Sequence, residues 1–231
     1  MKKLLGILVF VFASQINAQD NNALLKHYQA FYKQMKTQGD VQGVINALTH
    51  INVLSPNKAR LDTLAIIYMN NGNHAQALNT IGIEKNADDS DIALEVKALS
   101  LQALNQPARA LEHFEEMYKR KPNVQVAYEM ADLKIQLKDF TGASVNITYG
   151  MANAKDDMMR TYYESQRPYQ VPIKAGFIYL KGLVKFQENN ETNLDAAIAL
   201  FDEALAVAPN FGLAKLSKDA LVNRKTQPKQ D

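Results

Sequence analysis

The chain has 231 residues, with 26 basic and 24 acidic side chains and no cysteine or tryptophan. The lack of cysteine excludes disulfides, zinc–thiolate sites and thiol nucleophiles. Without Lys2 and Lys3 the remaining residues carry 24 basic and 24 acidic groups, a balance that excludes the strong positive field of a protein that binds nucleic acid or an anionic membrane.

Residues 1–18 have the layout of a secretory signal peptide. Two lysines precede an apolar run from Leu4 to Ala13, and Ala18 ends a small-residue segment. A membrane anchor needs about 20 apolar residues, about twice this run, so we expect cleavage after Ala18 rather than stable membrane insertion. No cysteine is present to carry a lipid. The sequence therefore predicts an exported, soluble, periplasmic protein that is not a lipoprotein.

One pattern then recurs every 33 residues. One column of equivalent positions contains Val44, Ala77, Ala110 and Ala143, followed four residues later by Leu48, Ile81, Phe114 and Ile147. An upstream column contains Ala65, Ala98 and Ala131, with Tyr32 as the odd member. A period of this length indicates stacked helical or helix–strand units rather than one closed core. The small residues are expected where two helices approach to about 8–10 Å.

Each repeat reads as two helices joined by a tight turn. In the second repeat, one apolar stripe of helical spacing ends at Gly72, which favours a helix C-terminus, and another begins at Ala77. The predicted repeats lie near residues 25–57, 58–90, 91–123, 124–152 and 178–211. A helix over 211–223 is expected to cap the array, and residues 224–231 are expected to form a disordered tail.

The period is lost in an irregular insert over residues 153–177. Asp156 and Asp157 are favourable at a helix start, so we expect a short helix from there to Tyr163. Two prolines make residues 167–172 extended, and the next helix is expected from about Pro172.

Tyrosine and arginine side chains gather in this insert, as they do at many binding surfaces. The candidate insert surface comprises Tyr162, Tyr163, Arg167 and Tyr169. The alternative is that the tyrosines pack the insert against the repeats, since an irregular segment must bury side chains to stay ordered.

The repeat resembles that of the tetratricopeptide repeat (TPR) family. The matching residues are Leu61, Leu64, Ala65, Tyr68, Ala77 and Ile81 in one repeat, Leu94, Ala98, Ala110, Phe114 and Pro122 in the next, and Ala197, Phe201, Ala204, Leu205 and Pro209 in the last. The resemblance covers about residues 24–152 and 178–223. Tyr32 and Val44 depart from it at small-residue positions, and Lys97 stands where leucine is usual. Ankyrin repeats share the period, but their Thr-Pro-Leu-His turn is absent.

The resemblance implies an exported bacterial TPR protein with an all-α fold. Residues 19–223 would form a right-handed superhelical solenoid of about five antiparallel helix pairs and a capping helix. In this family the first helices line a concave face, so the candidate partner-binding groove comprises Lys33, Asp62, Ile66, Met69, Glu95, Leu99, Tyr128 and Asp132. An exposed apolar strip of this kind marks an interaction site, unless a tight superhelix buries it.

One ligand class of the family is not expected. TPR proteins that grip the C-terminal carboxylates of heat-shock chaperones use a set of lysine, asparagine and arginine side chains on these faces. Only Lys33 stands at or near the corresponding places here, so that clamp is absent.

The sequence predicts no catalytic residue, cofactor or metal site. Its four histidines are widely spaced, and Asp156, Asp157 and Glu164 in the insert lack any pattern that positions them for acid–base chemistry. We therefore expect a non-enzymatic scaffold that binds a peptide or helix of another envelope protein in its groove. The alternative is a structural protein that associates with a second copy of itself and leaves the groove empty.

Overall fold

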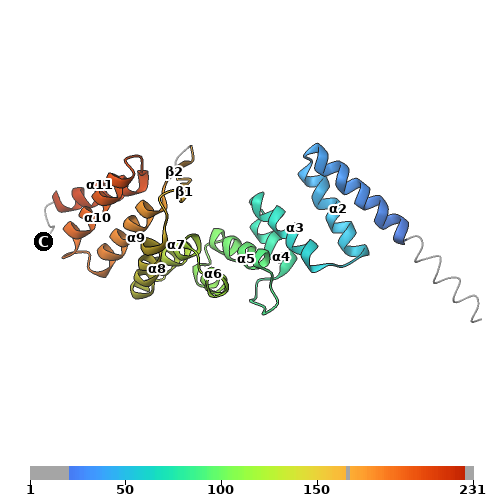
Figure 1. Cartoon of the computed structure of the whole chain (residues 1–231), viewed down its shortest axis with the longest axis horizontal. Helices are drawn as coiled ribbons and strands as arrows, with labels where there is room; N and C mark the ends of the chain where they lie inside the picture. The colour runs from blue at the N-terminus through green and yellow to red at the C-terminus, as the bar shows by residue number, and fades with distance from the viewer. Residues whose placement is uncertain (1–20, 165–166, 227–231) are drawn as a thin grey trace, which may run out of the picture. The chain divides into compact units, whose positions relative to one another are not determined.

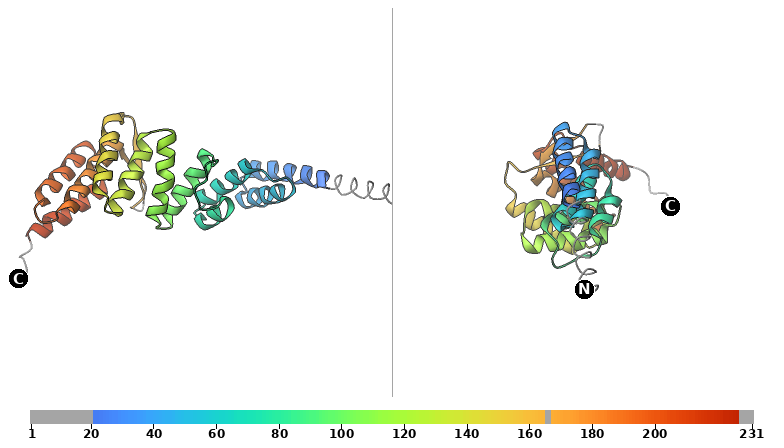
Figure 2. Two further views of the ribbon diagram at one scale, coloured as in Figure 1. Left: turned by 90° about the horizontal axis from the view of Figure 1, so that it is seen from below. Right: turned by 90° about the vertical axis from the view of Figure 1, so that its right-hand side faces the viewer.

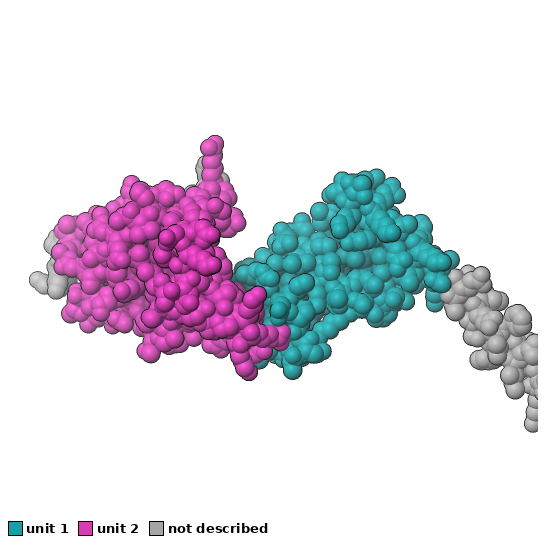
Figure 3. All heavy atoms as spheres, in the orientation of Figure 1, with its two compact units in different colours: residues 1–104 teal, residues 105–231 magenta. Residues whose placement is uncertain are grey.

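The computed structural model describes residues 21–164 and 167–226. The expected signal peptide and residues 227–231 lie outside this part of the chain. The fold is an all-α repeat of helix pairs, as expected, with one short β-hairpin. It divides into two compact units, Met1–Leu104 and Asn105–Asp231, which Figure 3 colours separately.

The N-terminal unit begins with a helix over residues 21–38. It continues with α2 (Val41–Leu54), α3 (Lys58–Asn70), α4 (His74–Ile81) and α5 (Asp91–Ala103) (Figure 1). Side-chain caps start three of these helices: Asp40, Asn57 and Ser90 each accept a hydrogen bond from a backbone N–H in the first turn. Such caps satisfy donors that have no partner within the helix.

Helix α4 is the short second helix of its repeat. It has 8 residues and ends before Gly82, which has a φ of 81°, whereas α2 has 14. The loop that follows is held by Lys97, whose buried Nζ donates hydrogen bonds of 2.7 Å to the Asp89 carboxylate and to the Glu84 carbonyl. The lysine at a usual leucine position therefore anchors the loop that replaces the end of α4.

The described part of the C-terminal unit contains six further helices and the hairpin. These are α6 (Pro107–Arg120), α7 (Val124–Gln136), α8 (Phe140–Asn153), β1 (Met159–Tyr162), β2 (Tyr169–Pro172), α9 (Ile173–Glu188), α10 (Leu194–Val207) and α11 (Gly212–Thr226). Helix α9 packs against both α8 and α10, and α10 packs against α11 (Figure 2). Gly150 permits the close approach of α8 and α9, because a Cβ atom there would overlap the Phe177 ring.

The short helix expected after Asp156 is instead strand β1, so that prediction was wrong. Strands β1 and β2 are antiparallel, with Arg160 opposite Val171 and Tyr162 opposite Tyr169. The side chains of Tyr162 and Val171 are buried in the core of the unit, and this packing overrides the local preference for a helix start. Asp156 forms an ion pair with Lys174 of α9 rather than capping a helix.

The sequence predicted a disordered tail over residues 224–231. This prediction was wrong for residues 224–226, because α11 continues to Thr226. The Lys225 ammonium lies 2.6 Å from an Asp195 carboxylate oxygen, and the Arg224 guanidinium lies over the Phe186 ring. These contacts hold the last turn of α11 against α10 and α9. No helix within the described residues is long and apolar enough to cross a membrane.

Candidate partner-binding face

Lys33, the first residue of the predicted groove, is exposed on the helix of residues 21–38. The other side chains predicted to line the groove in the N-terminal unit lie on α3 and α5, which pack side by side. Ile66 and Met69 of α3 and Leu99 of α5 are half-buried, and Glu95 is exposed. Ile66 and Met69 pack at their base against a small core cluster that includes Ala65 and Val96, leaving part of each side chain accessible. This gives a partly apolar face with the Glu95 carboxylate beside it.

Asp62 does not present its carboxylate on that face. It is 4% exposed, and it accepts a 2.7 Å hydrogen bond from the Ser90 hydroxyl. Ser90 is the residue that caps α5. Asp62 therefore joins α3 to the start of α5, and the predicted groove residue has a structural partner instead.

Tyr128 of α7 is likewise covered, by the hairpin and by α9. It is 3% exposed, and its hydroxyl oxygen lies 2.8 Å from that of Tyr162. The Arg160 guanidinium lies 3.8 Å from the centre of the Tyr128 ring, and the Phe177 ring packs edge-on against it. In the C-terminal unit the insert therefore packs on Tyr128, a residue predicted to line the groove. The candidate insert surface and the candidate groove, which the sequence predicted as separate surfaces, meet at this residue.

Arg160 fastens the hairpin to α7. Its guanidinium donates hydrogen bonds of 2.7 and 3.4 Å to the two carboxylate oxygens of Glu129. Paired hydrogen bonds of this kind are the strong form of an arginine–carboxylate contact. Burial raises the pKa of Tyr128 and of Tyr162 well above the ordinary range, so both hydroxyls are neutral donors and acceptors at neutral pH. These contacts hold the hairpin against α7 in the C-terminal unit.

Asp132, one turn further along α7, is the half-buried member of the predicted groove in this unit. Its carboxylate accepts a 3.0 Å hydrogen bond from Gln136, and no ion pair joins it to a cation in the described part of the chain. Burial, together with the charge of Glu129, raises its pKa above the ordinary aspartate value.

The candidate insert surface divides into packed and exposed residues. Tyr162 is 7% exposed, so it is core rather than surface, and half-buried Tyr169 stacks on it. Burial raises the pKa of Tyr169 to about 12, and its hydroxyl donates a hydrogen bond to Glu164. Tyr163 is 75% exposed and Arg167 is exposed as well, at the end of the hairpin that projects from the C-terminal unit in Figure 3.

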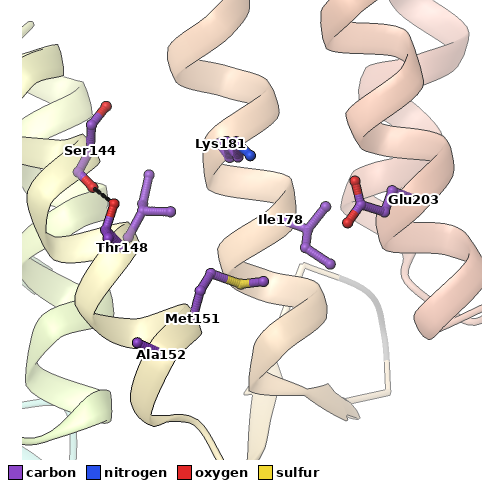
Figure 4. Close-up of a pocket in the computed structure, with 8 residues that line it drawn as sticks. Ser144, Thr148, Met151, Ala152, Ile178, Lys181 and Glu203 are labelled. Atoms are coloured by element: carbon purple, nitrogen blue, oxygen red, sulfur yellow. Dashed lines mark hydrogen bonds between the residues drawn. The ribbon is translucent and has the colours of Figure 1, made fainter.

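A cleft of about 470 Å³ on the other side of the C-terminal unit was not expected from the sequence. It lies between α8 and α10, with Ile178 and Lys181 of α9 between them (Figure 4). Its rim carries Lys181 and Glu203, neither of which forms an ion pair with another described residue. The sequence signal was present, since the 14 residues of α8 include no charged side chain.

Two smaller clefts lie in the N-terminal unit, on either side of Tyr32 and Thr63. One, of about 350 Å³, is also lined by Lys36, Val44 and Ile67. The other, of about 340 Å³, is lined by Gln29, Leu48 and Arg60, among others. The sequence signal for these clefts was the presence of Tyr32 and Val44 at positions where the other repeats have small residues.

Comparison with solved structures identifies the architecture. The chain is similar to YrrB, described as a TPR protein with an unusual peptide-binding site, with 14% identity over 90% of this chain and 97% of that chain and a TM-score of 0.64. It is similar to MamA, with 14% identity over 91% and 100% of the two chains and a TM-score of 0.56. This is a TPR fold. No protein-family model and no curated protein sequence matches the chain.

Each repeat of the TPR fold consists of a first and a second helix. Helices α3, α5, α7 and α9 are first helices, and α4, α6, α8 and α10 are second helices. The face that carries Ile66, Met69 and Leu99 is therefore a first-helix face, and the cleft of Figure 4 lies on the side of the second helices α8 and α10. We refer to the first-helix face defined by Ile66, Met69, Leu99 and Glu95 as the α3–α5 face.

The described part of this TPR chain holds no group of three or more His, Asp and Glu side chains that are close enough to bind a metal ion. Two carboxylates of the insert have other contacts: Asp156 pairs with Lys174, and Glu164 accepts a hydrogen bond from Tyr169. His113 of α6 is 2% exposed and lies in the packed interior.

Proposed function

We propose that the protein is a non-enzymatic scaffold that binds a peptide or helix of a partner protein on the α3–α5 face. One observation carries this proposal: Ile66, Met69 and Leu99 remain half-buried on a first-helix face, whereas Tyr128 on the first helix α7 is covered by the hairpin. A rigid helix face with partly exposed apolar side chains suits the docking of a peptide or amphipathic helix.

Two further observations support the proposal. YrrB, which shares the fold, is described as having a peptide-binding site. The leader-like residues 1–18 favour export, so we place the protein in the bacterial envelope, in soluble periplasmic form, with an envelope protein as its partner. Mass spectrometry of the exported protein tests the location, because cleavage after Ala18 leaves Gln19 as the first residue.

The contacts of the insert do not favour an enzyme there. Acid–base catalysis requires a carboxyl group within reach of a substrate. Asp156 is instead paired with Lys174, and Glu164 accepts the hydroxyl of Tyr169. We therefore assign these carboxylates to holding the hairpin in place.

The test is capture of a partner from a detergent-solubilised envelope fraction, identified by mass spectrometry. The mature protein is compared with the double variant Ile66→Glu/Leu99→Glu, which places two charges on the α3–α5 face. The matched control is Val53→Glu/Val145→Glu, because Val53 and Val145 are 75% and 66% exposed on other helices.

We expect one partner to be retained by the wild type and by the control and lost by the α3–α5 variant, with circular dichroism unchanged in all three. Retention of the same partner by all three proteins would contradict the proposal. If no partner is captured and sedimentation shows a concentration-dependent dimer, the protein associates with itself and the rival structural role holds.

A further inference from the structure

The two clefts beside Tyr32 exist because large residues stand at positions that the other repeats keep small. Ala65, Ala98 and Ala131 are fully buried in their repeats, and so are Ala77, Ala110 and Ala143. In the first repeat Tyr32 and Val44 occupy the equivalent positions, and both are half-buried. Helices approach closely only where the facing side chains are short. Tyr32 and Val44 both line one of the two openings, and Tyr32 and Thr63 of α3 line both of them.

Three lysines form a row along the helix of residues 21–38, and one of them, Lys36, lines an opening. Lys26, Lys33 and Lys36 are exposed and share one face of the helix with Gln29, because they are separated by seven and three residues. Gln29 lines one cleft and Lys36 lines the other, so Lys33 lies between them along the helix. None of the three ammonium groups has an ion-pair partner within residues 21–226 that the structure describes.

The charge around the clefts is strongly one-sided. The first repeat, residues 25–57, contains three basic side chains and one acidic side chain, Asp40. Asp40 is already engaged, because it accepts the backbone N–H of Gly43 at the start of α2. The cleft of Figure 4 differs, since its rim carries one lysine and one glutamate. The first repeat therefore carries a net positive charge, although the basic and acidic groups of residues 19–231 are equal in number.

We propose that the first repeat is a docking site for an acidic peptide segment that carries one large apolar side chain. The apolar side chain would enter a cleft beside Tyr32, and flanking aspartate or glutamate side chains would meet Lys33 and Lys36. Clefts of about 350 and 340 Å³ lie at the lower end of the range of small ligand pockets, which suits a single anchoring side chain. Unpaired, exposed lysines favour a carboxylate-bearing partner through charge complementarity.

The inference rests on the proposed binding function and names the chemistry of the partner segment. The inference predicts that the partner also makes a contact outside the α3–α5 face, because the docking site lies between the first helix and α3. A partner would then place its acidic segment on the first repeat and the rest of its chain on the α3–α5 face.

The test is fluorescence anisotropy with three labelled probe peptides of equal length. The first contains aspartate and glutamate around one central phenylalanine, the second has serine in place of the phenylalanine, and the third has lysine in place of every acidic residue. Each is titrated with the mature protein, with Lys33→Glu/Lys36→Glu, and with the control Lys119→Glu/Lys121→Glu, which makes the same change of net charge at exposed lysines of the C-terminal unit.

We expect the first probe to bind most tightly to the wild type and to the control. The Lys33→Glu/Lys36→Glu variant should bind it about tenfold more weakly, a difference of about 1.4 kcal/mol. The serine probe should also bind more weakly than the phenylalanine probe, because the cleft then stays empty. Equal loss in both lysine variants would mean attraction by net charge alone and would overturn the inference.

A second variant tests the cleft itself. Thr63 lines both clefts, so Thr63→Phe should fill them and remove the preference for phenylalanine over serine in the probe. If Thr63→Phe is not folded by circular dichroism, the probe comparison on the wild type still decides the point. Failure of every acidic probe to bind, with partner capture still lost in Ile66→Glu/Leu99→Glu, would overturn this inference and leave the proposed function standing.

Discussion

Lys97 is the largest side chain that is completely buried in the described part of the chain. Its ammonium satisfies both the Asp89 carboxylate and the Glu84 carbonyl, at 2.7 Å each. A charge taken out of water destabilises a fold unless it is paired and hydrogen-bonded. At the scale of the residue, this ion pair fixes the loop after α4 and so the start of α5, the helix that carries Leu99.

We predict that Lys97→Ala destabilises the protein by about 3–5 kcal/mol, because it leaves the Asp89 carboxylate buried and unpaired. The double variant Lys97→Leu/Asp89→Asn removes both charges and should recover much of that loss. Urea unfolding of Lys97→Leu, Asp89→Asn and the double variant measures the coupling. Independent, additive effects of the two substitutions would show that the ion pair does not hold the loop.

For Asp132, in contrast to Lys97, we predict that removing the charge stabilises the protein. Because burial raises its pKa in the folded state, folding favours the protonated form, and this stabilisation is lost as the pH rises through the raised pKa. Asp132→Asn should therefore be more stable than the wild type at neutral pH. The difference should shrink toward zero as the pH falls below the ordinary aspartate value. A variant less stable than the wild type at neutral pH would mean that the carboxylate has a cationic partner.

At the scale of the element, the hairpin is the feature that distinguishes the C-terminal unit. Its inner side chains, Tyr162 and Val171, belong to the core, and Arg160 joins it to Glu129 of α7. Gly176 of α9 permits the contact, because a Cβ atom there would lie 2.8 Å from the Tyr128 ring. The hairpin is therefore part of the packed unit and not a cover that opens over α7.

The adjacent tyrosines of the hairpin provide a matched test. Tyr162→Ala should destabilise the protein by about 3 kcal/mol or more, because it empties a buried aromatic site. Tyr163→Ala should change stability by less than about 0.5 kcal/mol, because that side chain is 75% exposed. Thermal or urea unfolding measures both. Equal, small effects would show that the hairpin does not dock on α7.

The sequence predicted the repeating helix pairs well because their signal is long and periodic. It failed at the hairpin because each strand has only four residues, too few for a period of two to stand out beside Asp156 and Asp157. It placed Tyr128 on a first-helix face but did not indicate its burial, since the covering residue, Tyr162, is 34 residues away. Tyr32 was recognised as an exception, but the clefts depend on how three helices pack around it.

At the scale of the whole molecule, the TPR fold supplies several first-helix faces, and the two units use them differently. In the C-terminal unit the hairpin covers Tyr128. In the N-terminal unit Ile66, Met69 and Leu99 stay partly open, next to a first repeat with three basic side chains and one acidic side chain. The central claim is that ligand binding belongs to the N-terminal unit.

Hydrogen–deuterium exchange of the mature protein, with and without the captured partner, tests this claim most directly. We predict that the partner slows exchange in residues 21–38, α3 and α5 and leaves α7, α8 and the hairpin unchanged. Slower exchange confined to α8–α10 or to the hairpin, with α3 and α5 unchanged, would contradict the account and move the binding site to the C-terminal unit.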